Sequence, residues 1–132
     1  MKSLKQLGTQ LDTMMDQFVG YEKGTKKDFL NTARRFLRRY AKEVLKLDEK
    51  GVKYEVRANR AGVAVSGDVI LHAEDLYINV SVGFSGQHVF YRTCKDMKDY
   101  VGGRNMWTTA EQLATRDVRT GAGDDQTQIG IC

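Results

Sequence analysis

The stretch from Thr25 to Lys50 has the periodicity of one long amphipathic helix. Its apolar side chains recur at steps of three and four residues, which places them along one side of a helix. Thr25 suits the N-cap, Asp28 completes a capping box, and Gly51 can adopt the left-handed conformation that ends a helix. Such a helix spans roughly 35 Å, so the rest of the chain must cover its apolar side. That side consists of Phe29, Leu30, Ala33, Phe36, Leu37, Tyr40, Ala41, Val44, Leu45 and Leu47.

The opposite side of this helix is strongly basic. Its cations are Arg34, Arg35, Arg38, Arg39, Lys42 and Lys46. Residues 26–50 contain nine basic and four acidic residues, a net charge of +5, whereas the whole chain carries +4. Like charges one turn apart repel each other, and a face that serves only solubility usually includes acidic residues. The clustering therefore favours a polyanionic partner, either nucleic acid or an acidic protein surface, and a solvated helix face is the alternative interpretation.

The segment before this helix predicts a first helix and a helical hairpin. Ser3 and Gln6 form a capping-box pattern, and the apolar period continues to about Val19. Gly20 and Gly24 bracket a short connection. The heptad seam of the first helix is only two heptads long, so packing within the chain is favoured over a coiled-coil dimer.

After the long helix the apolar period changes to two, which is typical of half-buried strands. The predicted strands cover residues 52–58, 63–73 with a bend at Gly67-Asp68, 76–84 and 88–94. Thr108 and Glu111 then predict a capped short helix to about Val118. Short connections make the sheet an antiparallel meander with one apolar face to cover.

The predicted fold class is therefore α+β. An N-terminal helical hairpin packs on a four-stranded antiparallel β-meander, followed by a short C-terminal helix and a tail. Residues 1–118 form one domain and residues 119–132 form the C-terminal tail. The first helix and the tail are the segments expected to make contacts if the chain forms a homo-oligomer.

Composition and cysteine usage narrow the class of protein. The chain has 132 residues, of which 41% are hydrophobic and 29% charged, as in globular domains. No apolar run approaches the roughly 20 residues of a membrane span, and the N-terminus lacks a secretory pattern. Cys94 and Cys132 are far apart in the sequence, and we expect both to be free thiols. We expect a cytoplasmic protein that makes no membrane contact.

Residues 95–107 form a predicted loop in which cations alternate with aromatic rings. Such a surface can contact phosphates and stack bases, but it equally resembles a protein-binding hot spot. Capping of the core by the rings of Tyr100 and Trp107 is the structural alternative. The candidate specificity residues are Arg92, Lys95, Lys98, Tyr100, Arg104, Asn105 and Trp107.

No catalytic, metal or cofactor site is predicted. The conceivable metal ligands His72, His88, Cys94 and Cys132 lack the spacing of a zinc motif. Asp68, followed later by Asp96 and Lys98, loosely resembles the carboxylate pattern of metal-dependent nucleases, but the last two fall in the predicted loop.

Several runs between residues 68 and 107 resemble a pattern in small uncharacterised bacteriophage and prophage proteins. They are Asp68-Val-Ile-Leu-His72, Asp75-Leu-Tyr-Ile78, Tyr91-Arg-Thr-Cys-Lys95, Lys98-Asp-Tyr100 and Gly102-Gly-Arg-Asn105. The resemblance implies a phage origin, and it carries no activity or site residue with it.

These observations together predict a non-enzymatic, phage-encoded binding protein. It would act on a nucleic-acid-handling complex of the host or the phage, through the basic helix and the basic, aromatic loop. A virion structural subunit, such as a connector, completion or decoration protein, is the alternative. A small metal-dependent nuclease is a second alternative.

Overall fold

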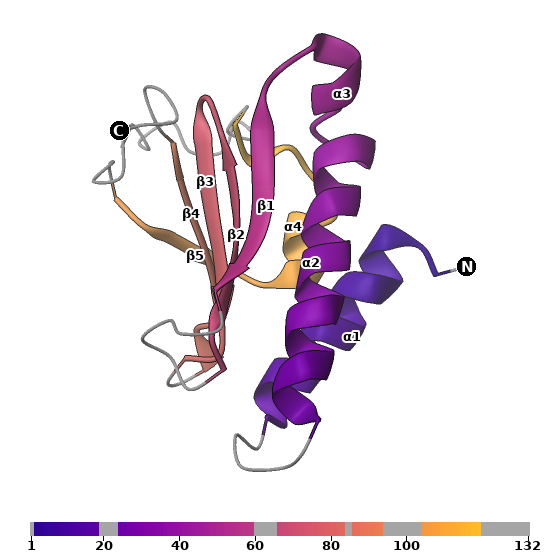
Figure 1. Ribbon diagram of the computed structural model, residues 1–132, viewed down its shortest axis with the longest axis vertical. Helices are drawn as coiled ribbons and strands as arrows, with labels where there is room; N and C mark the ends of the chain where they lie inside the picture. Colours follow the sequence, from indigo (N-terminus) through magenta and orange to yellow (C-terminus); the bar gives the residue numbers. More distant parts are fainter. Residues whose placement is uncertain (1, 19–23, 60–65, 84–85, 94–103, 120–132) are drawn as a thin grey trace.

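Helices and a sheet form two layers in the computed structural model of the chain (Figure 1). The structure describes residues 2–18, 24–59, 66–83, 86–93 and 104–119. The helices are α1 (Leu4–Asp16), α2 (Thr25–Glu43), α3 (Leu47–Lys50) and α4 (Ala110–Leu113). The strands are β1 (Tyr54–Asn59), β2 (Asp68–Ala73), β3 (Leu76–Ser81), β4 (Val89–Thr93) and β5 (Met106–Thr108). The predicted α+β class, with helices before an antiparallel sheet, is confirmed.

The sheet is an open antiparallel meander in the order β1-β2-β3-β4-β5. It has five described strands, so the prediction of four is wrong. The additional strand, β5, is three residues long and lies at the end of the predicted loop, where so short a segment shows no period of two. One cross-strand row links Val56, Leu71, Ile78, Tyr91 and Met106.

The face of the sheet that carries this row packs on the helices. α2 lies against β1 and β2, and α1 packs on α2 and on α4. Period-two residues of the strands and the apolar stripe of α2 therefore share one core, in which each fully buried large side chain contributes about 1.5–3 kcal/mol. The largest fully buried side chains include Leu11, Met15, Phe29, Phe36, Tyr40, Leu71 and Ile78.

The continuous helix predicted for residues 25–50 is wrong, because the chain breaks between α2 and α3. The backbone amide of Leu45 donates to the carbonyl of Tyr40, and Lys46 adopts a left-handed conformation with a φ of 54°. Leu45 and Leu47 are both fully buried. In a continuous helix these two side chains would point about 200° apart, so the break allows both of them into the core.

Of the predicted helix ends, those at Ser3 and Gly51 are confirmed and the one at Thr25 is wrong. At the start of α1, the Ser3 hydroxyl accepts from the Gln6 amide at 3.1 Å and the Gln6 side chain accepts from the Ser3 amide at 2.9 Å, which confirms that capping box. The predicted cap at Thr25 is wrong, because Gly24 (φ 88°) is the N-cap of α2 and Thr25 is its first residue. Gly51 closes α3 with a φ of 69°, as predicted.

The short C-terminal helix begins one residue later than its capping pattern predicts. The hydroxyl of Thr109, rather than that of Thr108, accepts from the amide of Gln112 at 3.1 Å. The resulting helix, α4, is about one turn long and ends well before Val118. Its two leading amides also donate to the carboxylate of Asp12 at 2.8 and 2.9 Å. Burial raises the pKa of Asp12, and these two hydrogen bonds oppose that rise.

Other predicted boundaries shift by a few residues. The first helix ends at Asp16, three residues before its predicted end, and the third strand ends at Ser81. The second strand begins at Asp68, directly after Gly67 (φ 75°), so this pair precedes the strand instead of bending it. Residues 63–65, Cys94 and residues 120–132 of the predicted tail lie outside the described residues.

Candidate nucleic-acid interface

A strip of exposed polar side chains runs along one side of α2. Its members, here called the α2 strip, are Lys27, Asn31, Arg35, Arg38 and Lys42. They follow one another at steps of four, four, three and four residues, which keeps all of them on one side of the helix. The strip is about 22 Å long and contains no acidic side chain.

The strip cations have no carboxylate partner among the residues that the structure describes. Within the described residues, no carboxylate lies within 4.0 Å of the charged groups of Arg35, Arg38 or Lys42. Other arginines are paired at short range: Arg39 with Glu43 at 2.6 Å, Arg57 with Glu55 at 2.9 Å and Arg119 with Asp117 at 2.7 Å. The difference is between arginines that have a carboxylate partner and strip arginines that have none among the described residues.

Three of the six predicted binding cations lie outside the strip. Arg39 donates from Nη1 to the carbonyl of Lys2 at 2.8 Å, besides its pair with Glu43, so it ties the start of α1 to α2. Arg34 is half-buried, and its inaccessible Nε makes no hydrogen bond within the described ranges. Lys46 is exposed at the break after α2.

An open groove of about 470 Å³ borders the C-terminal half of the strip. It separates the basic wall formed by Arg38 and Lys42 from a wall that carries Asp48, Tyr54 and Glu55. The Tyr54 hydroxyl lies 3.2 Å from Oδ1 of Asp48. Because the second wall is acidic, a polyanion would contact the helix side of the groove.

The other predicted surface falls on the face of the sheet that points away from the helices. Phe90 pairs with Trp107 across β4 and β5, and Nη1 of Arg92 donates to Oδ1 of Asn105 at 3.4 Å. Three predicted residues, Arg92, Asn105 and Trp107, are thus brought together. Arg104 is exposed just before β5. Lys95, Lys98 and Tyr100 lie outside the described residues.

A row of aromatic rings crosses this outer face, and of its members only Trp107 was predicted as part of a binding site. His72 meets Tyr77 edge to face at 5.3 Å, Tyr77 stacks with Phe90 at 6.1 Å, and Phe90 meets Trp107 edge to face at 5.2 Å. The guanidinium of Arg92 lies 4.2 Å above the Tyr77 ring. A check of strand positions that alternate with the apolar ones would have found these rings, since they share one parity on successive strands.

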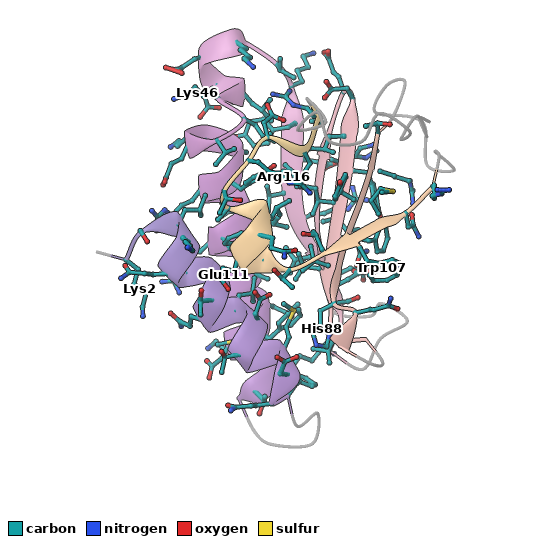
Figure 2. The ribbon with its side chains drawn as sticks, turned by 180° about the vertical axis from the view of Figure 1, so that it is seen from behind. Lys2, Lys46, His88, Trp107, Glu111 and Arg116 are labelled. Atoms are coloured by element: carbon teal, nitrogen blue, oxygen red, sulfur yellow. The ribbon has the colours of Figure 1, made fainter. Side chains whose placement is uncertain are left out.

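The two predicted surfaces lie on opposite sides of the molecule. α2 covers the inner face of the sheet, whereas Trp107 points away from the helices, as Figure 2 shows. One rigid partner surface therefore cannot contact the α2 strip and Trp107 together. The α2 strip supplies charge without aromatic rings, and the outer face supplies the rings.

The conceivable metal ligands His72 and His88 each contact other side chains. No three His, Cys, Asp or Glu residues gather in a metal-binding cluster among the residues that the structure describes. His72 lies within the aromatic row, and His88 bonds to Asp16 at 3.0 Å. Asp96 and Lys98 of the nuclease-like pattern are not among the described residues. Likewise, no helix in the described part is long and apolar enough to span a membrane.

No family model, curated protein or solved structure matches the chain. The phage origin inferred from residues 68–107 therefore stays a prediction.

Proposed function

We propose that this chain is a non-enzymatic binding protein that acts on a nucleic-acid-handling complex and contacts phosphates through the α2 strip. The observation that carries the proposal is the contrast among its arginines. Arg39, Arg57 and Arg119 are each paired with a carboxylate, while Arg35 and Arg38 face solvent without one in the described part. Unpaired cations in line favour an anion with regularly repeated charges, because each contact releases condensed counterions.

The length of the strip supports nucleic acid as the partner. Its four cations are spread over about 22 Å of helix, a distance over which either strand of a nucleic acid presents several phosphates. An acidic protein surface can satisfy the same charges and is the alternative partner. The two partners differ in salt dependence and in chemistry, so a direct comparison distinguishes them.

Fluorescence anisotropy with labelled DNA and RNA, at salt concentrations from about 50 to 200 mM, tests the proposal. Replacing both Arg35 and Arg38 by Glu should weaken binding by at least about tenfold and reduce the salt slope by about one for each lost phosphate contact. Arg57→Glu serves as a control for a charge reversal elsewhere, since Arg57 lies on β1, at the opposite edge of the sheet from β5 and outside the α2 strip, and it should change affinity much less.

Two outcomes would contradict the proposal. If the Arg35 and Arg38 reversals leave binding unchanged, the α2 strip is not the contact surface. If the protein binds polyglutamate but neither DNA nor RNA, the partner is an acidic protein. Circular dichroism of each variant shows whether the fold is intact in these measurements.

A further inference from the structure

A compact cluster of side chains lies on the outer face of the sheet, on β4, on β5 and just before β5. Phe90 lies opposite Trp107, and Nη1 of Arg92 donates at 3.4 Å to Oδ1 of Asn105, the residue directly before β5. The cluster thus combines two aromatic rings, a guanidinium and an amide. These groups match the parts of a nucleotide: a planar base, polar base edges and an anionic phosphate.

Trp107 is the accessible member of this cluster. The residue is 48% exposed and does not belong to the hydrophobic core, so its ring does not cap the core. It is the only large apolar side chain with such exposure in the described ranges. The edge-to-face contact with Phe90, at an interplanar angle of 65°, supports the indole from one side.

Arg92 is held in place beside these rings. It lies 4.2 Å above the Tyr77 ring and donates to Asn105, and these contacts restrict its position. A restricted guanidinium loses little conformational entropy when it binds a ligand. Arg104, exposed just before β5, adds a second positive charge near the same edge of the sheet.

We propose that this cluster binds an unpaired base of a single-stranded nucleic acid, which stacks on Trp107 while Asn105 and Arg92 contact its polar edge and phosphate. The inference rests on the proposed function and adds the class of nucleic acid. A base inside a duplex is stacked between its neighbours and cannot present its face to a ring on a sheet. An acidic peptide would use the cations of the cluster but would leave the indole face without a planar partner.

The intrinsic fluorescence of the protein reports directly on this site, because Trp107 is the only tryptophan in the chain. Titration with oligothymidylate should quench the emission as a base stacks on the indole. A duplex of the same length and heparin, which carries negative charges but no bases, should bind without comparable quenching. Quenching by heparin to the same extent would overturn the inference, since charge alone would then account for the signal.

Variants separate this site from the α2 strip. Trp107→Ala should lower the affinity for oligothymidylate roughly tenfold, since stacking of one base contributes about that factor, and should leave heparin binding unchanged. Trp107→Phe, which keeps a ring, should retain most of the affinity. The Arg35 and Arg38 reversals should instead weaken the binding of both ligands.

The possible failures are distinguishable. If heparin and DNA bind but Trp107→Ala behaves like the unmodified chain, the stacking site is wrong while the α2 strip stands. If oligothymidylate does not bind and an acidic peptide quenches Trp107, the outer face is a protein-binding surface, and the inference is overturned together with its nucleic-acid partner.

Discussion

Nε2 of His88 lies 3.0 Å from Oδ1 of Asp16 and joins the segment before β4 to the end of α1. On the other side of the ring, Nδ1 accepts from the amide of Gly83 at 3.0 Å. Because Nδ1 acts as the acceptor, the proton of the neutral imidazole is on Nε2, which donates to Asp16. The buried histidine thus connects the helical layer to a turn at the edge of the sheet.

This arrangement predicts unequal effects for its two partners. His88→Ala should lower the free energy of unfolding by about 2–3 kcal/mol, because it removes a buried ring and the acceptor for Gly83. Asp16→Ala should cost less than about 1 kcal/mol, since the Asp16 side chain is 65% exposed. Urea unfolding measures both values. Equal losses for the two variants would show that the hydrogen bond between His88 and Asp16, rather than the buried ring, supplies the stability.

Gly8 is predicted to resist replacement even though it lies inside a helix. Alanine normally stabilises a helix interior by about 1 kcal/mol relative to glycine. Here a Cβ at Gly8 would lie 2.7 Å from the carbonyl oxygen of Ala110, so α1 and α4 would have to separate. Gly8→Ala should therefore lower the free energy of unfolding by more than about 1 kcal/mol, whereas Thr9→Ala at the exposed neighbouring position should not. A gain in stability for Gly8→Ala would contradict the described contact between α1 and α4.

Replacement of Lys46 by glycine should stabilise the protein. Its left-handed backbone (φ 54°) is strained for a residue with a Cβ, by about 1–2 kcal/mol. Lys46→Gly removes this strain and should raise the free energy of unfolding by about 1 kcal/mol. Lys42→Gly within α2 is the matched control and should lower it by a similar amount. If thermal unfolding shows that both Lys46→Gly and Lys42→Gly lower the stability, α2 continues through residue 46.

Most of the layered architecture was predictable because it depends on local periodicity. The steps of three and four residues in α2 and the alternation around Ile78 decide which side of each element is buried, and the core contains those residues. The Ser3 cap was predictable because its two hydrogen bonds lie within one turn. Features that depend on distant partners were not. The break before Lys46 arises because Leu45 and Leu47 both enter the core, and β5 exists because its three residues pair with β4.

The candidate site was predictable in part for the same reason. Helical spacing correctly places Arg35, Arg38 and Lys42 on one exposed side of α2. It cannot show that Arg39 is paired with Glu43 and with the carbonyl of Lys2, because the second contact joins residues 37 positions apart. The rings of the outer aromatic row share one strand parity, which the sequence does show, but their contacts with one another depend on the register of several strands, which the sequence pattern does not determine.

The pH dependence of stability should distinguish Asp117 from Asp12, because the pKa of Asp117 is lowered and that of Asp12 is raised. Although burial raises the pKa of Asp117, its hydrogen bonds from the side chain and backbone amide of Arg119 lower it below the ordinary value of 3.8. The charged form is thus favoured in the folded chain. Its contribution to stability is present above pH 3.8 and is lost as the pH falls through the lowered pKa.

The contribution of Asp12 to stability should change with pH in the opposite direction. Burial raises its pKa, so the folded chain favours the protonated form, and stability is gained as the pH falls through the raised value toward 3.8. Compared with Asp117→Asn, the unmodified chain should lose its advantage on acidification below pH 3.8. Compared with Asp12→Asn, it should gain stability on acidification above pH 3.8. Urea unfolding across this pH range measures how each stability difference between the unmodified chain and its variant changes with pH. If both differences change in the same direction, the pKa values of Asp12 and Asp117 are not shifted in opposite directions.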